Sequence, residues 1–231
     1  MSQRTIVLAS ASPRRRDLLG YLGVAFHALA TDAEYQDFGP PPQLAARLPA
    51  AAVPPHFHPT LLAWRKAFAA CSLAPDSVII GADTIVVLDG DVLNKPAGPQ
   101  QARVMLQRLA GRTHTVYTGL AVIDAPTERT LFALEQSQVE IAPLSEETIR
   151  AYVATGEPLD KAGAYGIQGL GGQLVRTVTG SYTNVVGLPL TRLHDLLAEV
   201  GITHLIAPAE AYHQWLAAQG KESLPCPPTL P

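Results

Sequence analysis

The stretch that most constrains this chain runs from Val78 to Pro96 and reads VIIGADTIVVLDGDVLNKP. Two runs of β-branched and apolar residues flank a small polar step at 81–84, a pattern that predicts a buried β-strand. The dipeptide at 89–90 is Asp-Gly, which is typical of a tight hairpin turn, so a paired return strand is expected from Val92 onward. A polar interruption therefore lies inside an apolar element.

Asp83 is the charged residue in that interruption. An ionised carboxylate is costly to bury alone, so Asp83 must pair with a cation, bind a metal ion or stay protonated. Lys95, across the predicted turn, is the nearest candidate cation in the sequence. Two interpretations stay open: a structural ion pair that fixes the hairpin, or a catalytic carboxylate beside a phosphate-binding lysine.

A second candidate site lies near the N-terminus, where an apolar run at Thr5–Ala9 predicts a strand. Ser12 fits the N-cap of a following helix and Pro13 its first position. Free N–H groups at a helix N-terminus bind anions, and the hydroxyl of Ser10 and the arginines at 14–16 lie at the same end. Three consecutive arginines cannot share one helix face, so at most two could serve one ligand. The plain alternative is a capped helix with solvated arginines.

Periodicity and turn residues predict the remaining elements. Helices are expected at Leu61–Ser72, Gln100–Ala110, from Ser145, and at Leu188–Val200. Strands are expected at Val24–His27, Thr113–Val122, Thr130–Ile141 and Leu174–Val178. Five of the 18 glycines fall in the segment 160–172, which reads DKAGAYGIQGLGG and lacks the lysine of a Walker-type phosphate loop.

Two segments lie outside this regular pattern. Phe38–Thr60 holds seven of the 20 prolines and is expected to be a surface excursion with little regular structure, in which His56 and His58 are solvated rather than metal ligands. The segment 201–231 contains one candidate amphipathic helix at Pro208–Ala218 and a proline-rich end that is expected to be mobile.

Composition excludes several classes of function. Charged residues make up only 16% of the chain and the formal net charge is −3, so no excess of lysine and arginine supports a nucleic-acid or membrane surface. Two cysteines form neither a disulfide framework nor a zinc site. No apolar run is long enough to span a bilayer, and the N-terminal order of apolar and basic residues is the reverse of a secretory signal. A cytoplasmic location is therefore expected.

No Walker, Rossmann, zinc-protease or nucleophile-elbow motif occurs in the chain. What remains is an anion-binding helix start, scattered lysines and the lone carboxylates of Glu34 and Asp83. These are parts for metal-assisted phosphate chemistry.

Four segments together resemble the Maf family of nucleotide pyrophosphatases: LASASPRRRDLL, GADTIVVLDGDVLNKP, GEPLDKAGAYGIQGLGG and SYTNVVGLPL. The resemblance spans about Thr5 to Ala198, in family order. It implies an α/β fold of two lobes, with a mixed sheet flanked by helices around a central cleft. It also implies hydrolysis of nucleoside triphosphates to the monophosphate and pyrophosphate, dependence on Mg²⁺ or Mn²⁺, and a homodimer. The family is linked to clearance of modified nucleotides and to inhibition of septum formation.

The resemblance also implies a domain organisation. Residues 1–200 form the Maf-like domain, with 38–60 as an insertion that looks longer and richer in proline than is usual for the family. Residues 201–231 are expected to form a C-terminal extension that is partly disordered and has no counterpart in the family.

The same resemblance implies roles for individual residues. Asp83 matches the catalytic base, and Glu34 matches the acidic residue near the metal, which Asp83 also helps to hold. The positions that contact the triphosphate are matched by Ser10, Ser12, Arg14, Lys66 and Lys95.

Three positions track substrate choice in the family, and Arg14, Thr84 and Gln168 resemble the branch that cleaves dTTP and UTP. A glutamine amide presents one donor and one acceptor, and can match the O4 and N3–H edge of uracil or thymine. The sister branch, which prefers N7-methyl-GTP, has a glutamate there, and a glutamate can only accept. The plain alternative is that Gln168 satisfies backbone groups in a glycine-rich loop.

The expected function is thus a pyrophosphatase acting on dTTP and UTP, with modified pyrimidine nucleotides as further candidates. One alternative is the same chemistry on N7-methyl-GTP. Another is a nucleotide-binding regulator of cell division without catalytic activity. Turnover assays separate these three.

Overall fold

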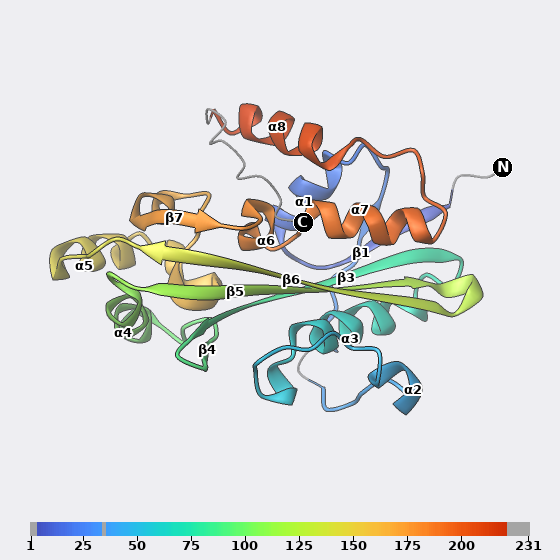
Figure 1. Cartoon of the computed structure of the whole chain (residues 1–231), viewed down its shortest axis with the longest axis horizontal. Helices are drawn as coiled ribbons and strands as arrows, with labels where there is room; N and C mark the ends of the chain where they lie inside the picture. Colours follow the sequence, from blue (N-terminus) through green and yellow to red (C-terminus); the bar gives the residue numbers. More distant parts are fainter. Residues whose placement is uncertain (1–3, 34–35, 221–231) are drawn as a thin grey trace.

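The computed structural model describes residues 4–33 and 36–220, and its centre is one twisted sheet (Figure 1). The strand order is β2-β1-β3-β5-β6-β7, with β4 paired to β3. The strands are β1 Thr5–Ala9, β2 His27–Ala28, β3 Ser77–Leu88, β4 Asp91–Leu93, β5 Thr113–Asp124, β6 Arg129–Ile141 and β7 Val175–Thr179. The pairs β1–β2 and β1–β3 are parallel and the others antiparallel, so the predicted α/β class with a mixed sheet is confirmed.

The helices cover both faces and one end of this sheet. They are α1 Pro13–Gly20, α2 Pro42–Ala45, α3 Pro59–Cys71, α4 Pro99–Leu109, α5 Glu146–Ala154, α6 Tyr182–Val186, α7 Leu190–Glu199 and α8 Pro208–Ala218. In Figure 1, α3 lies against one face, α1, α7 and α8 lie on the other, and α4 and α5 lie at the far end of β5 and β6. None of the described helices is long and apolar enough to cross a bilayer.

The predicted central hairpin is confirmed. Strand β3 is buried along its length except at Asp83 and Thr84, which are half-buried. Asp89 and Gly90 both have positive φ angles, 53° and 84°, as the favoured two-residue hairpin turn requires. Strand β4 then returns antiparallel, with Val86 opposite Leu93.

Helix α3 lies unusually close to the sheet because two glycines face it. A Cβ atom on Gly81 would lie 2.0 Å from the carbonyl oxygen of Ala63, and one on Gly119 would lie 2.2 Å from the amide nitrogen of Thr60. Gly119 is also the register partner of Asp83 across the β3–β5 pair. The glycines therefore bring the backbone of α3 directly onto the strand that carries Asp83.

The structure differs from the predicted elements at several ends. The short second strand lies at His27–Ala28 rather than at 24–27, and α6 was not predicted. Helix α3 begins at Pro59, inside the segment expected to be irregular. That segment also holds the four-residue helix α2 and a 3-10 turn at Pro55–Phe57. Each of these elements begins with a proline, and the first position of a helix needs no N–H donor. A segment rich in proline can therefore still contain short helices.

The proline-rich segment is tied to the body of the protein. The ring of Phe38 packs against Trp64 of α3, with centroids 5.6 Å apart, and Arg65 donates to the Phe38 carbonyl oxygen at 2.6 Å. Further along, Arg47 donates to the carbonyl oxygen of Thr130, and His58 Nε2 lies 2.8 Å from the carbonyl oxygen of Pro49. The segment is a covering layer over α3 rather than a detached loop.

We expect shortening within 40–55, with Phe38 retained, to leave kcat/KM within about threefold of the wild type, because surface loops tolerate changes in length. Loss of the Arg47 contact should lower the melting temperature modestly. Steady-state hydrolysis and thermal unfolding of the shortened protein test this. Loss of all activity in a folded variant would mean that the segment closes over the ligand.

The helix predicted at Pro208–Ala218 is confirmed as α8, and it is integrated into the core. Trp215 is fully buried in the apolar cluster that joins α1, α7 and the sheet. Its indole nitrogen donates to Asp17 Oδ2 of α1 at 2.7 Å. The proline-rich end at 221–231 lies outside the described residues.

Candidate functional site

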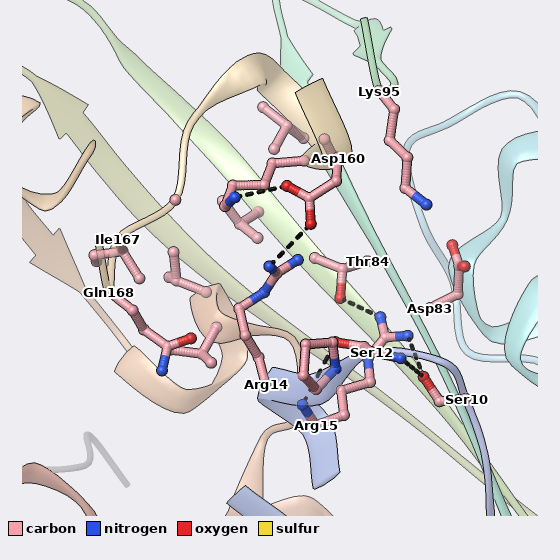
Figure 2. Close-up of a pocket in the computed structure, with 18 of the residues that line it drawn as sticks. Ser10, Ser12, Arg14, Arg15, Asp83, Thr84, Lys95, Asp160, Ile167 and Gln168 are labelled. Atoms are coloured by element: carbon pink, nitrogen blue, oxygen red, sulfur yellow. Dashed lines mark hydrogen bonds and ion pairs between the residues drawn. The ribbon is translucent and has the colours of Figure 1, made fainter. Parts of the chain in front are cut away.

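A pocket of about 310 Å³ opens between the start of α1, strand β3 and the loop that follows α5. It collects side chains from segments that are far apart in the sequence (Figure 2). The sequence-predicted site residues that line it are Ser10, Ser12, Arg14, Lys66, Asp83, Thr84, Lys95 and Gln168. Glu34 lies outside the described residues.

Lys66 and Asp83 form an ion pair on one side of the pocket. The Lys66 Nζ atom lies 2.7 Å from Asp83 Oδ1, and the two side chains are only 10% and 15% exposed. The lysine comes from α3, which the glycines of β3 and β5 allow to approach. Because both side chains are largely buried, the two charges offset their desolvation only in good hydrogen-bonding geometry. The hydrogen bond also fixes the direction of the carboxylate.

The partner expected for Asp83 from the sequence was Lys95, and the ion pair that the structure shows is with Lys66 instead. Lys95 lines the same pocket, and Figure 2 shows its side chain extending toward the Asp83 carboxylate. Proximity along a hairpin gave the wrong partner because the packing of α3 on the sheet decides which ammonium group reaches Asp83. Two lysines therefore flank one carboxylate.

The start of α1 forms a second side of the pocket, and its predicted capping is confirmed. Ser12 is the N-cap, its Oγ accepts from the amide of Arg15, and Pro13 occupies the first turn. The amide of Ser12 in turn donates to Ser10 Oγ at 3.2 Å. The hydroxyls of both serines and the positive end of the helix dipole thus lie at the pocket.

Arg15 is a pocket residue that the sequence analysis did not single out. Its guanidinium donates to Thr84 Oγ1 at 3.0 Å, to Ser10 Oγ at 3.3 Å and to the Gly187 carbonyl oxygen at 2.7 Å. Two of the three consecutive arginines, Arg14 and Arg15, line the pocket, within the limit of two expected from helix geometry. No local pattern distinguishes Arg15 from its neighbours, because Gly187 lies 172 positions away.

Asp160 and Lys161 form the opposite rim and were likewise missed. Arg14 reaches across the pocket to Asp160 Oδ2 at 3.3 Å, and Lys161 lies 2.6 Å from Asp160 Oδ1 (Figure 2). Partial burial works against the charge of Asp160, but Lys161 and Arg14 outweigh it and hold the pKa of this carboxyl below its ordinary value. Asp160 is thus an anion that keeps Arg14 at the rim.

One part of the pocket lining is uncharged. Tyr165 lines the pocket, and its hydroxyl lies 2.7 Å from Nε2 of the buried His114. Burial raises the pKa of Tyr165 and lowers the pKa of His114 to about 4. Both side chains are therefore uncharged near neutral pH, and the charge of the pocket comes from the residues already described.

The pocket is divided between two kinds of group. In Figure 2, Asp83 and Lys95 lie on one side, Ile167 and Gln168 lie on the other, and Arg14 and Thr84 lie between them. The first side is suited to a phosphate chain, because its cations and helix start attract oxyanions. The second offers an apolar surface and an amide, which suit a ring with a polar edge.

Within the described residues, the pocket offers few oxygen ligands for a divalent cation. Among the described residues, no group of three or more histidine, cysteine, aspartate or glutamate side chains could form a metal site. Magnesium typically binds one or two carboxylates together with substrate phosphates and water. Asp83, one of whose oxygens bonds Lys66, fits that sparse pattern.

Comparison with known proteins gives a consistent result. The family model described as "Maf-like protein" matches residues 5–200. A dTTP/UTP pyrophosphatase of Pelotomaculum thermopropionicum is 48% identical over 198 residues, which cover 86% of this chain and 97% of the relative. Proteins of the same name from Shewanella denitrificans and Dictyoglomus thermophilum are 49% and 42% identical, over 84% and 88% of this chain and 95% and 100% of the relatives.

Proposed function

Because this chain belongs to the Maf-like family, we propose that it hydrolyses dTTP and UTP to the nucleoside monophosphate and pyrophosphate. The observation that carries the proposal is the Lys66–Asp83 ion pair, set in a pocket with cations on one side and Gln168 on the other. The relatives' shared name, dTTP/UTP pyrophosphatase, supports it independently.

The cationic side of the pocket suits a triphosphate. Lys66, Lys95, Arg14 and Arg15 line the pocket together with the N-terminus of α1. Preorganised cations and N–H dipoles lower the barrier most where negative charge develops on the leaving group. In this proposal they bind the phosphate chain and offset the charge of the departing pyrophosphate.

Asp83 acts as the general base in this proposal. It accepts a proton from a water molecule, whose oxygen forms a bond to the α-phosphorus while the bond from that phosphorus to the α–β bridging oxygen breaks. Pyrophosphate leaves with the electron pair of the broken bond. The hydrogen bond from Lys66 holds Asp83 Oδ1 and so fixes the orientation of the carboxylate that takes the proton.

We further propose that Mg²⁺ or Mn²⁺ is required, held by Asp83, substrate oxygens and Glu34, which the family resemblance places near the metal. When bound, a divalent cation neutralises phosphate charge and polarises the phosphoryl oxygens. The homodimer and the cytoplasmic location remain predictions from the sequence.

Pyrophosphate release across a nucleotide panel tests the proposal. The panel contains UTP, dTTP, CTP, ATP, GTP and N7-methyl-GTP, each with Mg²⁺, with Mn²⁺ and with a chelator. We expect UTP and dTTP to be the best substrates and the chelator to abolish turnover. A purified, folded protein that releases no pyrophosphate from any nucleotide contradicts the proposal, and a preference for N7-methyl-GTP contradicts its base specificity.

Base choice gives a sharper prediction at Gln168. An amide that donates to O4 and accepts from N3–H must be held in one orientation to reject cytosine, which reverses that pattern. We expect kcat/KM for CTP to be lower than for UTP by at least roughly tenfold, about 1.4 kcal/mol. Gln168→Glu should lower UTP and dTTP turnover, because a carboxylate repels O4.

Gln173→Glu is the matched control for that substitution. Gln173 directly follows the glycine-rich segment but is exposed and does not line the pocket. It should leave all rates unchanged. Equal kcat/KM for UTP and CTP in the wild type, or an unchanged UTP rate in Gln168→Glu, refutes the role of Gln168 and leaves the pyrophosphatase reaction standing.

A further inference from the structure

The segment that carries Ile167 and Gln168 has no strand partner, although it forms one side of the pocket. Short 3-10 turns at Ala162–Ala164 and Leu170–Leu174 border it. A segment without a hydrogen-bonded ladder keeps one conformation only if side chains satisfy its amides.

Glu157 supplies most of those bonds. Its Oε2 accepts from the amide of Leu170 at 2.9 Å, and its Oε1 accepts from the amide of Gly171 at 3.1 Å. The hydroxyl of Tyr152 also donates to Oε1 at 2.9 Å, and accepts from the amide of Gly166 at 3.1 Å. Gln168 is thus bracketed on both sides by amides bound to one carboxylate and one phenol.

The protonation of Tyr152 agrees with this arrangement. Burial, and then the neighbouring Glu157 carboxylate, raise the pKa of the phenol. The hydroxyl therefore keeps its proton near neutral pH and can donate to Glu157.

Two glycines of this segment lie against Glu157 and Tyr152. A Cβ atom on Gly169 would lie 2.5 Å from Glu157 Oε2, and one on Gly171 would lie 2.4 Å from the Tyr152 hydroxyl oxygen. Close approach of backbone to a bound group is a common reason for glycine. Here Gly169 approaches the Glu157 carboxylate and Gly171 approaches the Tyr152 hydroxyl, so these two glycines leave room for the pair of side chains that binds the segment.

We propose that Glu157 is a positioning residue for base recognition: it holds the 166–171 segment so that Gln168 meets the pyrimidine edge in one orientation. Glu157 does not line the pocket, so it acts through the segment and not on the nucleotide. The inference rests on the proposed function, because it assumes that Gln168 reads a pyrimidine. It fixes the backbone from which the Gln168 side chain reaches the pyrimidine edge.

Glu157→Gln tests this with little change of shape. One carboxylate oxygen becomes an NH₂ group, which cannot accept from a backbone amide. We expect KM for UTP to rise about tenfold, as for loss of a hydrogen bond to a charged group, with kcat within about threefold. We also expect the ratio of kcat/KM for UTP to that for CTP to fall, because Gln168 loses its fixed orientation.

Tyr152→Phe is the second variant, since it removes the hydroxyl that joins Glu157 to Gly166 but keeps the buried ring. It should shift KM and the UTP-to-CTP ratio in the same direction. Glu146→Gln is the matched control, because Glu146 is a glutamate at the start of α5 that contacts Arg103 and Gln107 away from the pocket. It should leave both quantities unchanged.

Amide hydrogen exchange gives a readout that does not depend on turnover. The amides of Leu170 and Gly171 should exchange at least about tenfold faster in Glu157→Gln than in the wild type. If the wild type cleaves UTP and Glu157→Gln keeps the wild-type UTP-to-CTP ratio or amide exchange, the inference is overturned and the proposed function stands. If the wild type does not cleave UTP, both are overturned.

Discussion

Asp83→Asn should lower kcat by about 10²–10⁴, the range expected when a general base loses its charge. The substitution keeps the shape of the side chain and an oxygen that can accept from Lys66, so the packing of α3 on β3 should be retained. KM should change less than kcat, because the cations that hold the phosphate chain remain. Steady-state pyrophosphate release and a thermal unfolding curve measure the two effects.

Asp89→Asn is the matched control for that experiment. Asp89 is an exposed aspartate at the hairpin turn of the same strand, where it pairs with Arg112. Asparagine tolerates the positive φ of 53° at that position, so both stability and kcat should stay close to wild type. Turnover near the wild-type rate in a folded Asp83→Asn variant would rule out Asp83 as the base.

Trp215→Ala should destabilise the protein by about 3–5 kcal/mol, the cost of truncating a large buried aromatic side chain. Trp215 of α8 is fully buried, and its loss also removes the hydrogen bond to Asp17 of α1. Denaturant unfolding monitored by circular dichroism gives the change in free energy. Because Trp215 does not line the pocket, kcat of the folded fraction should be unchanged.

Trp215→Phe separates the two contributions of this side chain. It keeps most of the ring and removes the indole N–H, so it should cost much less than the alanine variant. A loss of less than about 1 kcal/mol in Trp215→Ala would mean that α8 is an appendage whose packing contributes little.

The sequence predicted best the features that neighbouring residues determine. The hairpin at Asp89 and the capped helix start at Ser12 depend on turn and capping chemistry within a few positions, and both are present. The helix at Pro208–Ala218 followed from its apolar periodicity, although that periodicity could not show that Trp215 joins the main core.

What the sequence did not predict depends on contacts between distant segments. Lys66 rather than Lys95 pairs with Asp83 because α3 packs closely on β3 and β5 at Gly81 and Gly119. Arg15 is fixed by a carbonyl group that comes late in the chain, and Glu157 by amides in a loop without regular structure. Charge and hydropathy patterns carry no information on which distant backbone group will meet a given side chain.

The glycines at 81 and 119 make the distance between Lys66 and Asp83 depend on how closely the backbone of α3 can approach the sheet. The nearest atoms of α3 there are the Ala63 carbonyl oxygen and the Thr60 amide nitrogen, and the nearest side-chain atom is the Cβ of Ala67, so the helix has no flexible side chain that could move to absorb an error. Even one added methyl group must lift the helix, and the lysine it carries would withdraw from Asp83. We therefore expect substitutions at these two glycines to abolish turnover in proteins that still fold.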